Sequence, residues 1–292
     1  MEKSNERIYV LGATGNVGSV VLDKLIKSGI QVTAYTRTPP KVANTSSTIT
    51  IIQGGYHDLT PFNESIAGHT RLFLLVPDMD DMAAIKIALA KKAYEAGVKQ
   101  IVDLSVQSVP WRQYQALLPH QVAEKAIYEL ANKPSRNHGF VSLRPSNFMS
   151  NLLFNLETIQ KQSTIMDSAS APDELQEWIS PCDIGEVAAR ILMDPVEKHG
   201  DAAYELVGDV KTPQERAQFL SELLDRTITY TQVPPQTMYD TFLKMGSASD
   251  LAYCAATYRA VSPAVTRGLP ILLGRQPESI QKWMARNKSA FS

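Results

Sequence analysis

The stretch Ile8-Tyr9-Val10-Leu11-Gly12-Ala13-Thr14-Gly15-Asn16-Val17-Gly18 decides the fold of this chain. Its first four residues are apolar and favour a buried strand, while Val17, Val20 and Leu25 recur at the spacing of a helix face. In a glycine turn of this kind the backbone approaches a pyrophosphate, which meets free amides and the positive end of the helix dipole. We predict that residues 12–18 bind a dinucleotide; a turn with only a packing role is the alternative.

The segments that follow alternate between short β-rich runs and helical patterns. Strands are expected at residues 31–35, 48–52, 72–76, 100–104 and 140–143, and helices at 81–96 and 120–132. Such alternation favours parallel strands joined by helical crossovers. The predicted fold class is therefore α/β, with a doubly wound parallel Rossmann sheet.

After Pro145 the pattern changes. Asp183 is expected to cap a helix, and Thr212 and Glu215 form a predicted capping box at the start of another. Further strands are expected at 203–207 and 228–233, and the rest of the chain looks mostly helical. We place a dinucleotide-binding Rossmann domain at residues 1–150 and a smaller, mixed and mostly helical substrate region at 151–292, interleaved with the Rossmann sheet.

The end of the second expected strand indicates which dinucleotide binds. An NAD site usually carries an Asp or Glu about 20 residues after the glycine turn, where it bonds the ribose 2′-hydroxyl. Here Arg37 lies nineteen positions beyond Gly18. A guanidinium holds a 2′-phosphate through charge-assisted hydrogen bonds, so we predict NADP(H), with Lys41 as a second and weaker positive group. The alternative is a strand-end Arg37 that only faces solvent.

Composition excludes several other classes. The 292 residues include 29 basic and 30 acidic side chains, so the net charge of −1 offers no bulk attraction to nucleic acid or an anionic membrane. Two cysteines are too few for a disulfide framework, and no Cys/His spacing indicates a metal site. We find neither a signal peptide nor a run of about 20 apolar residues. These features favour a cytoplasmic protein without metal, nucleic-acid or membrane partners.

Several motifs together resemble the NmrA-like family of atypical short-chain dehydrogenases/reductases. The resemblance extends over about residues 6–233, and the order of the motifs is more specific than any one of them. The last 60 residues or so match no motif that we recognise. The matching stretches are residues 12–18, Tyr35-Thr36-Arg37, Gly54-Gly55-Tyr56-His57-Asp58, Leu143-Arg144-Pro145-Ser146-Asn147-Phe148-Met149-Ser150-Asn151, Ile179-Ser180-Pro181-Cys182-Asp183-Ile184-Gly185-Glu186-Val187-Ala188 and Tyr204-Glu205-Leu206-Val207-Gly208.

This resemblance implies an NADP(H)-binding Rossmann domain and a small C-terminal region that encloses a substrate cleft. It also implies one of two kinds of function. Some members of the family reduce quinones, imines, enones or benzylic ethers, and others are redox-sensing regulators that have lost catalysis. The chain departs from the family pattern at Gly54-Gly55, where Gly-Asp is usual, and in an insertion at residues 132–137.

The proton-donating pair of ordinary short-chain dehydrogenases is missing, because none of the 11 tyrosines has a lysine four positions on. Aligned on Glu124, which fits the family's His-x-x-x-Glu pattern, His120 lies where ether-reducing relatives carry a catalytic lysine. Imidazole titrates near neutral pH, so His120 is a candidate proton donor; a helix-start histidine that only hydrogen-bonds is the alternative. Ser105, at a strand end, and Tyr114, in the loop before the helix, are the other catalytic candidates.

Strand-end positions supply most of the remaining candidates, because ligands of open α/β sheets bind at the carboxyl ends of the strands. The predicted cofactor contacts beyond the glycine turn are Arg37, Val76, Pro77, Lys125, Pro145, Asn147 and Phe148, and the predicted substrate contacts are Trp111, Phe154 and Trp178. Packing in loops and core is the alternative reading of these residues. We expect Lys86, Lys91 and Lys92 to be solvated charges on a helix face, and residues 236–258 to form a lid, a partner surface or core.

The sequence therefore favours an NADPH-dependent reductase that transfers hydride to a small or medium apolar organic substrate of the quinone, enone or imine type. Quinones and iminium ions accept hydride without a strong general acid, which agrees with the missing Tyr/Lys pair. The alternative is a non-catalytic NADP(H)-sensing regulator that binds a partner protein. The sequence leaves a homodimer open as well.

Overall fold

The computed structural model describes residues 6–39, 47–132 and 138–292. The chain divides into two compact units. Unit 1 consists of Met1–Ser108, Pro119–Arg144 and Ile184–Glu205, and unit 2 consists of Val109–Leu118, Pro145–Asp183 and Leu206–Ser292. Since each unit is assembled from three separate stretches, the chain passes between the two repeatedly.

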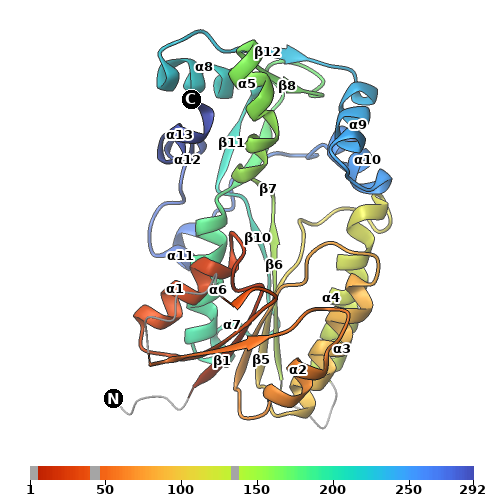
Figure 1. Ribbon diagram of the computed structural model, residues 1–292, viewed down its shortest axis with the longest axis vertical. Coiled ribbons are helices and arrows are strands. Elements are labelled where there is room, and N and C mark those ends of the chain that lie inside the picture. Colours follow the sequence, from red (N-terminus) through yellow and green to blue (C-terminus); the bar gives the residue numbers. More distant parts are fainter. Residues whose placement is uncertain (1–5, 40–46, 133–137) are drawn as a thin grey trace. The chain divides into compact units, whose positions relative to one another are not determined.

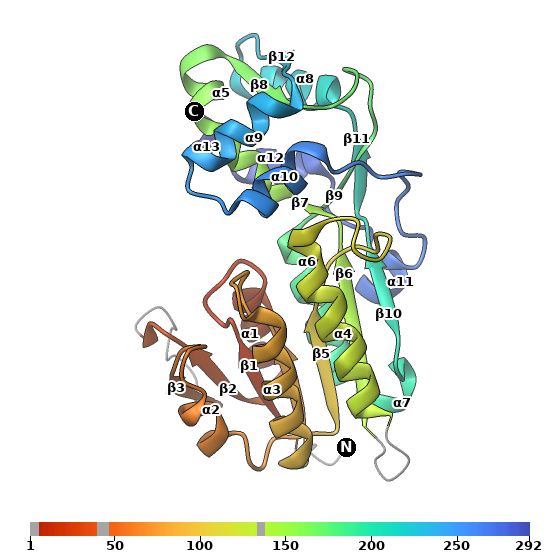
Figure 2. The same ribbon diagram turned by 90° about the vertical axis from the view of Figure 1, so that its right-hand side faces the viewer.

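Unit 1 is built on a seven-stranded sheet with the order β10-β6-β5-β4-β1-β2-β3 (Figures 1 and 2). β1 pairs in parallel with both β2 and β4, and the pairs β2–β3, β4–β5 and β5–β6 are parallel too. The Ser142 amide bonds the Ala202 carbonyl and the Ser146 amide bonds that of Leu206, so β10 runs parallel to β6. The strands are β1 (Arg7–Leu11), β2 (Gln31–Thr36), β3 (Ile49–Gln53), β4 (Arg71–Leu74), β5 (Gln100–Leu104), β6 (Gly139–Pro145) and β10 (Ala203–Leu206). This confirms the predicted α/β class and the doubly wound parallel sheet.

The strand order places the topological switch point between β1 and β4. From β1 the chain adds β2 and β3 on one side, then crosses to the other side to add β4, β5 and β6. The loops that leave β1 and β4 therefore diverge at the carboxyl edge of the sheet, and ligands of open α/β sheets bind in that crevice.

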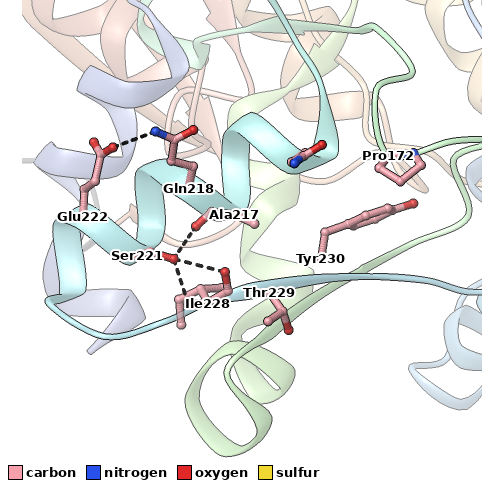
Figure 3. A pocket seen from close by; sticks show the side chains of 9 residues that line it. Pro172, Ala217, Gln218, Ser221, Glu222, Ile228, Thr229 and Tyr230 are labelled. Carbon is pink, nitrogen blue, oxygen red and sulfur yellow. Dashed lines mark hydrogen bonds between the residues drawn. The ribbon is translucent and has the colours of Figure 1, made fainter.

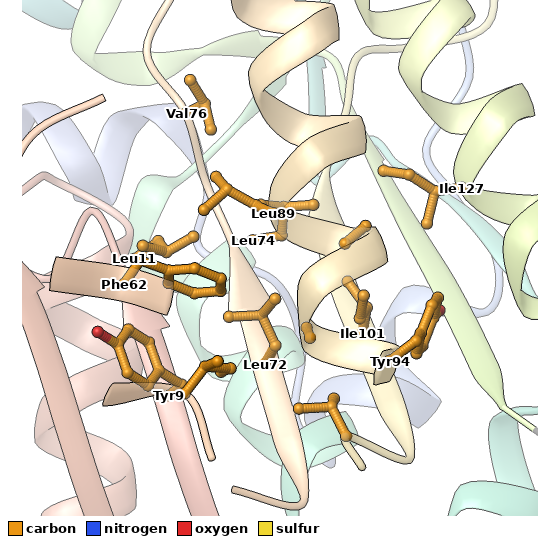
Figure 4. Packing of buried hydrophobic residues seen from close by; sticks show 14 of the residues in the cluster. Tyr9, Leu11, Phe62, Leu72, Leu74, Val76, Leu89, Tyr94, Ile101 and Ile127 are labelled. Carbon is orange, nitrogen blue, oxygen red and sulfur yellow. The ribbon is translucent and has the colours of Figure 1, made fainter. Parts of the chain in front are cut away.

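Helices cover both faces of the sheet of unit 1. On one face the ring of Phe62 packs edge-on against Tyr9, and leucines of β1, β4 and α3 pack together (Figure 4). On the other face α6 lies against α1, since a Cβ on Gly185 would come within 2.6 Å of the Val20 Cβ. The helices are α1 (Gly18–Lys27), α2 (Thr60–Ser65), α3 (Met82–Glu95), α4 (Leu118–Ala131), α6 (Pro181–Met193) and α7 (Val196–His199).

Unit 2 contains two small sheets and most of the C-terminal helices. One sheet has the order β11-β9-β7, with β11 antiparallel and β7 parallel to β9, and the other is the parallel pair β12–β8. Its core gathers Met149, Ile165, Trp178, Leu220 and Trp283. Its elements are η2 (Gln115–Leu117), β7 (Asn147–Phe148), η3 (Met149–Asn155), α5 (Leu156–Gln162), β8 (Thr164–Asp167), β9 (Gln176–Ile179), β11 (Asp209–Lys211), α8 (Pro213–Leu224), β12 (Thr229–Gln232), α9 (Pro235–Lys244), α10 (Ser249–Thr257), α11 (Leu269–Leu273), α12 (Ile280–Arg286) and α13 (Lys288–Phe291).

The local capping predictions have mixed outcomes. The Thr212–Glu215 capping box is present: the Thr212 hydroxyl accepts from the Glu215 amide, and the Glu215 carboxylate accepts from the Thr212 amide. The expectation that Asp183 caps its helix is wrong, because α6 begins two residues earlier and the Ser180 hydroxyl accepts from the Cys182 amide at 3.2 Å. Asp183 is buried and instead accepts hydrogen bonds from Arg275 and from the Glu278 amide.

None of the helices in the described part of the chain is both long and apolar enough to cross a membrane.

Candidate functional site

The glycine turn after β1 has the backbone shape that its sequence predicts. Gly12 adopts a φ of +67°, and the Gly15 amide donates to the Gly12 carbonyl at 3.0 Å, which closes the turn. Ala13 and Val17 are buried and hold the turn against the core, while Thr14, Gly15 and Asn16 are exposed. The exposed residues therefore form the rim that a ligand would meet.

Two features fit this turn to a pyrophosphate. A Cβ on Gly18 would lie 2.1 Å from the Gly12 carbonyl oxygen, so only glycine lets the helix start this close to the turn. Val17 occupies the N-cap of α1 without a side-chain cap, and the first turn of α1 carries no acidic residue. The Ser19 amide is bonded to the Gly15 carbonyl and the Val20 and Val21 amides to that of Val17. This end of α1 therefore attracts an anion mainly through the positive end of the helix dipole.

Arg37 follows the last residue of β2 and is exposed. Among residues 6–39, 47–132 and 138–292, no carboxylate forms an ion pair with its guanidinium. A free cation at the end of β2 suits a 2′-phosphate and gives no acceptor for a 2′-hydroxyl. Lys41, the second predicted positive group, lies outside the described residues.

The loop after β3 is tied to β2 and to the end of β4. The Tyr35 hydroxyl donates to the Gly55 carbonyl, and the Tyr56 hydroxyl donates to the Leu75 carbonyl, both at 2.8 Å. A Cβ on Gly54 would lie 2.2 Å from the Tyr35 hydroxyl, which explains this glycine. A Cβ on Gly55 would meet nothing within 4 Å, so packing does not demand glycine where the family usually has an acid.

His120 lies in the first turn of α4 and faces the loop after β4. Its Nε2 is 3.1 Å from Oδ1 of Asp78, and its imidazole is largely buried at 8 % exposure. The hydrogen bond from His120 is the largest effect on the pKa of Asp78 and lowers it, so this carboxyl group is ionised near neutral pH. Nδ1 of His120 is buried and has no hydrogen-bond partner among the described residues.

Lys86 is not the solvated charge that the sequence suggests. Both Lys86 on α3 and Asp103 on β5 have fully buried side chains, and Nζ lies 2.8 Å from Oδ1 of Asp103. Nζ also donates to the Leu104 carbonyl at 2.7 Å. The expectation is wrong because the partner carboxylate comes from a distant strand. Of the neighbouring lysines on α3, Lys91 is exposed as expected and Lys92 is half-buried.

A second charged network holds the segment after β5. Arg144, near the end of β6, forms ion pairs with Glu124 on α4 and Glu205 on β10. The Arg144 guanidinium also donates to the Ser108 hydroxyl. The amide and the hydroxyl of Ser108 both donate to the Glu205 carboxylate. Burial acts to raise the pKa of Glu124, but the hydrogen bonds from Arg144, Ser142 and Ser105 outweigh it and lower the pKa. Ser105, a predicted catalytic residue, is therefore buried and bonded to Glu124.

The other predicted residues of unit 1 differ in exposure. Val76 is buried just beyond β4, Pro77 next to it is exposed, and Lys125 is exposed on α4.

In unit 2, Tyr114 is buried and its hydroxyl donates to the Thr257 carbonyl at 3.3 Å. Trp111 and Phe154 are exposed, and Phe154 packs edge-on against Phe242 of α9. Trp178, at 6 % exposure, lies under the guanidinium of Arg216 within the core of this unit. Pro145 is buried, and Asn147 and Phe148 on β7 are half-buried.

A cavity of about 560 Å³ in unit 2 takes in none of the predicted site residues (Figure 3). Several of its polar groups bond one another: Gln218 donates to Glu222, and the Ser221 hydroxyl bonds Ala217 and Ile228. Its lining is Pro172, Gln214, Ala217, Gln218, Ser221, Glu222, Ile228, Thr229 and Tyr230. We assign it no function.

Sequence reasoning missed Asp78, the Lys86–Asp103 pair and the Arg144–Glu205 contact. Asp78 directly follows Val76 and Pro77, so the strand-end argument used for those two residues could have found it. The other two contacts join elements far apart in the chain, and no local pattern marks them.

Comparison with known proteins gives a family and several relatives. The model of the NmrA-like family matches residues 4–264, beyond the residue 233 at which the recognised motifs end. A (4-alkanoyl-5-oxo-2,5-dihydrofuran-3-yl)methyl phosphate reductase of Streptomyces griseus is 25 % identical, covering 98 % of this chain and 99 % of the relative.

Two solved structures share the fold at lower identity. An NADPH-dependent quinone oxidoreductase of Escherichia coli, complexed with NADPH, has a TM-score of 0.79 and 21 % identity, covering 96 % of this chain and 99 % of that chain. NmrA, a negative transcriptional regulator in complex with NADP, has a TM-score of 0.77 and 17 % identity, covering 96 % and 94 %.

Proposed function

The chain belongs to the NmrA-like family, and from its site we propose that it is an NADPH-dependent reductase of an organic acceptor, of the quinone, enone or imine type. The observation that carries this proposal is Arg37 at the end of β2, exposed and without an ion-pair partner among the described residues, together with the glycine turn after β1. The reductase activity of the Streptomyces relative and of the Escherichia coli quinone oxidoreductase supports the reaction class.

In this proposal the residues of unit 1 bind and orient the cofactor. The amides of residues 13–18 other than Gly15, whose amide closes the turn, hold the pyrophosphate, and Arg37 holds the 2′-phosphate. Bound NADPH supplies a hydride from its nicotinamide ring to an electrophilic carbon of the acceptor. The further cofactor contacts that we propose are Val76, Pro77, Lys125, Pro145, Asn147 and Phe148, and the substrate contacts are Trp111, Phe154 and Trp178.

His120 is the proposed proton donor to the reduced acceptor. It is a titratable side chain at the carboxyl edge of the sheet, and Asp78 already binds one nitrogen of its ring. Ser105 and Tyr114 are weaker candidates, since each hydroxyl already has a partner, Glu124 and the Thr257 carbonyl respectively.

Arg37→Asp tests the cofactor assignment. We expect the Kd for NADPH to rise by roughly 10- to 100-fold, because a charge-assisted pair is replaced by repulsion, while the Kd for NADH stays within about twofold. Titration of nicotinamide fluorescence measures both constants. Arg267→Asp makes the same charge change at an exposed arginine outside the site and serves as the control. An equal loss for both cofactors would contradict the role of Arg37.

A regulator is the second candidate, favoured by the structural likeness to NmrA. NADPH oxidation by the purified protein, followed at 340 nm with a panel of quinones, enones and imines, separates the two functions. Turnover with any acceptor class supports the reductase. Tight NADPH binding with no turnover across the panel supports the regulator.

A further inference from the structure

We propose that Asp78 is a positioning residue that fixes the tautomer of His120, so that Nδ1 of the imidazole is the atom that gives up a proton. This inference rests on the proposed reductase function. It adds which atom of His120 carries the proton and which residue controls the protonation of that atom.

The contact between the two side chains determines which nitrogen is protonated. A carboxylate has only acceptor sites, so the Asp78–Nε2 contact of 3.1 Å requires a hydrogen on Nε2. The neutral ring then has a lone pair on Nδ1, and the protonated ring has its second N–H there. A carboxylate bound to one imidazole nitrogen orients the ring for proton transfer at the other nitrogen, as in hydrolase triads.

The surroundings of Nδ1 indicate a ligand-dependent role. This nitrogen is closed to water and has no partner among the described residues, although buried polar atoms are rarely left unpaired in native proteins. Asp78, by contrast, has a side chain that is 66 % exposed. Its carboxylate is therefore not a buried group that pairs with His120 as part of the core. An acceptor that displaces the side chains over Nδ1 would supply the missing partner.

The charges near the pair favour an ionised Asp78. Lys86 on α3 acts on Asp78 through its positive charge, and its own partner is Asp103 on β5. Glu124, one turn beyond His120 on α4, is bound by Arg144 and is not free to compete for the ring. Among the described residues, the carboxylate that contacts His120 is therefore that of Asp78.

The proposed step distinguishes two kinds of acceptor. A quinone takes up a hydride and one proton to become a hydroquinone. The proton comes from the protonated ring: the N–H bond at Nδ1 breaks as the O–H bond forms, the ring is left neutral with its hydrogen on Nε2, and solvent returns a proton to Nδ1 after the product leaves. A cationic triarylmethane dye takes up a hydride alone and becomes neutral, so its reduction breaks no N–H bond. Loss of the Asp78 contact should therefore slow the first reaction relative to the second.

The test compares NADPH oxidation with 1,4-naphthoquinone and with crystal violet. For Asp78→Asn we expect the ratio of kcat values, quinone over dye, to fall on the order of 10²-fold, because general-acid catalysis is lost only where a proton is transferred. Asp78→Glu should restore part of the ratio, and His120→Gln should lower it as far as Asp78→Asn does. Asp80→Asn, the same change at an exposed neighbour in the loop, is the matched control. An unchanged ratio, or an equal fall in the ratio for Asp80→Asn, would overturn the proposal.

A second measurement needs neither cofactor nor turnover. In the ¹⁵N spectrum of histidine-labelled protein, the ring signals lost in His120→Gln identify His120, and we expect its neutral form to carry hydrogen on Nε2. Asp78→Asn should shift the population towards the Nδ1–H tautomer. A wild-type ring protonated at Nδ1 in its neutral form would overturn the proposal. A chain that reduces no acceptor of the panel contradicts the proposed function, and the tautomer measurement then decides the role of Asp78 by itself.

Discussion

At the scale of single residues, His69 shows how burial controls a charge outside the site. Its Nδ1 lies 2.9 Å from the Ile66 carbonyl and must donate to it, so Nε2, at 2.8 Å, accepts from the Thr33 hydroxyl. The ring is 2 % exposed and packs edge-on against Tyr9. Burial lowers the pKa of His69 to about 4, so the folded protein keeps this ring neutral at neutral pH.

The depressed pKa of His69 predicts a loss of stability in mild acid. Between pH 6.5 and about 4 the unfolded chain binds a proton at this histidine and the folded protein does not. The free energy of unfolding therefore falls as the pH is lowered through this window, by about 3 kcal/mol in total from this one group. Urea denaturation at a series of pH values measures it.

The His69→Gln variant isolates this contribution. A glutamine does not titrate, so we expect the variant to lose less stability than wild type between pH 6.5 and 4, whatever its stability at pH 7. Parallel stability curves for the two proteins over this window would show that the His69 pKa is not depressed.

At the scale of elements, the sequence predicted those whose signal is local. The strands of unit 1 and its helices α1, α3, α4 and α6 have their own apolar runs and turn residues, whereas the short helices α2 and α7 were not predicted. Thr212–Glu215 is a complete capping box within four residues. The strands β7, β8, β9 and β11 were not predicted. They have two to four residues each, too few to show a period, and β8 exists through pairing with β12, where Thr164 meets Thr229.

The same limit explains the outcome at the site. The glycine turn was predictable because seven consecutive residues contain all of its geometry, and Gly18 has no room for a Cβ. The burial of Lys86 depends on Asp103, which lies on another element seventeen residues away. From the sequence alone, a lysine on a helix face is expected to be exposed to solvent. The sequence does not show that the fold places the Asp103 carboxylate next to Lys86.

The pairing of α3 with β5 through Lys86 and Asp103 predicts a non-additive response to mutation. Lys86→Met leaves the Asp103 carboxylate buried without its cation, which should lower the free energy of unfolding by about 3–5 kcal/mol. The double variant Lys86→Met/Asp103→Leu removes both charges and should recover more than half of that loss, because the desolvation penalty of the pair disappears as well. Chemical denaturation of the single and double variants gives the coupling. Losses that simply add would mean that the two charges do not stabilise each other.

At the scale of the whole molecule, the chain carries a net charge of −1. With basic and acidic residues nearly balanced, the molecule offers an anionic cofactor little long-range attraction. In the proposed site, discrimination between NADPH and NADH depends on Arg37, which is exposed and has no carboxylate partner among the described residues. An interaction made by one exposed charge is open to screening by salt.

This exposure predicts that the preference for NADPH depends on ionic strength. The Debye length falls from about 30 Å at 0.01 M to about 3 Å at 1 M salt, so the ratio of the NADH Kd to the NADPH Kd should fall by roughly tenfold over that range. Both cofactors share the pyrophosphate and the glycine turn, so these contributions cancel in the ratio. In Arg37→Asp the fall should vanish or reverse, because the local charge has changed sign. A ratio that stays constant with salt in the wild type would mean that buried groups, rather than Arg37, hold the 2′-phosphate.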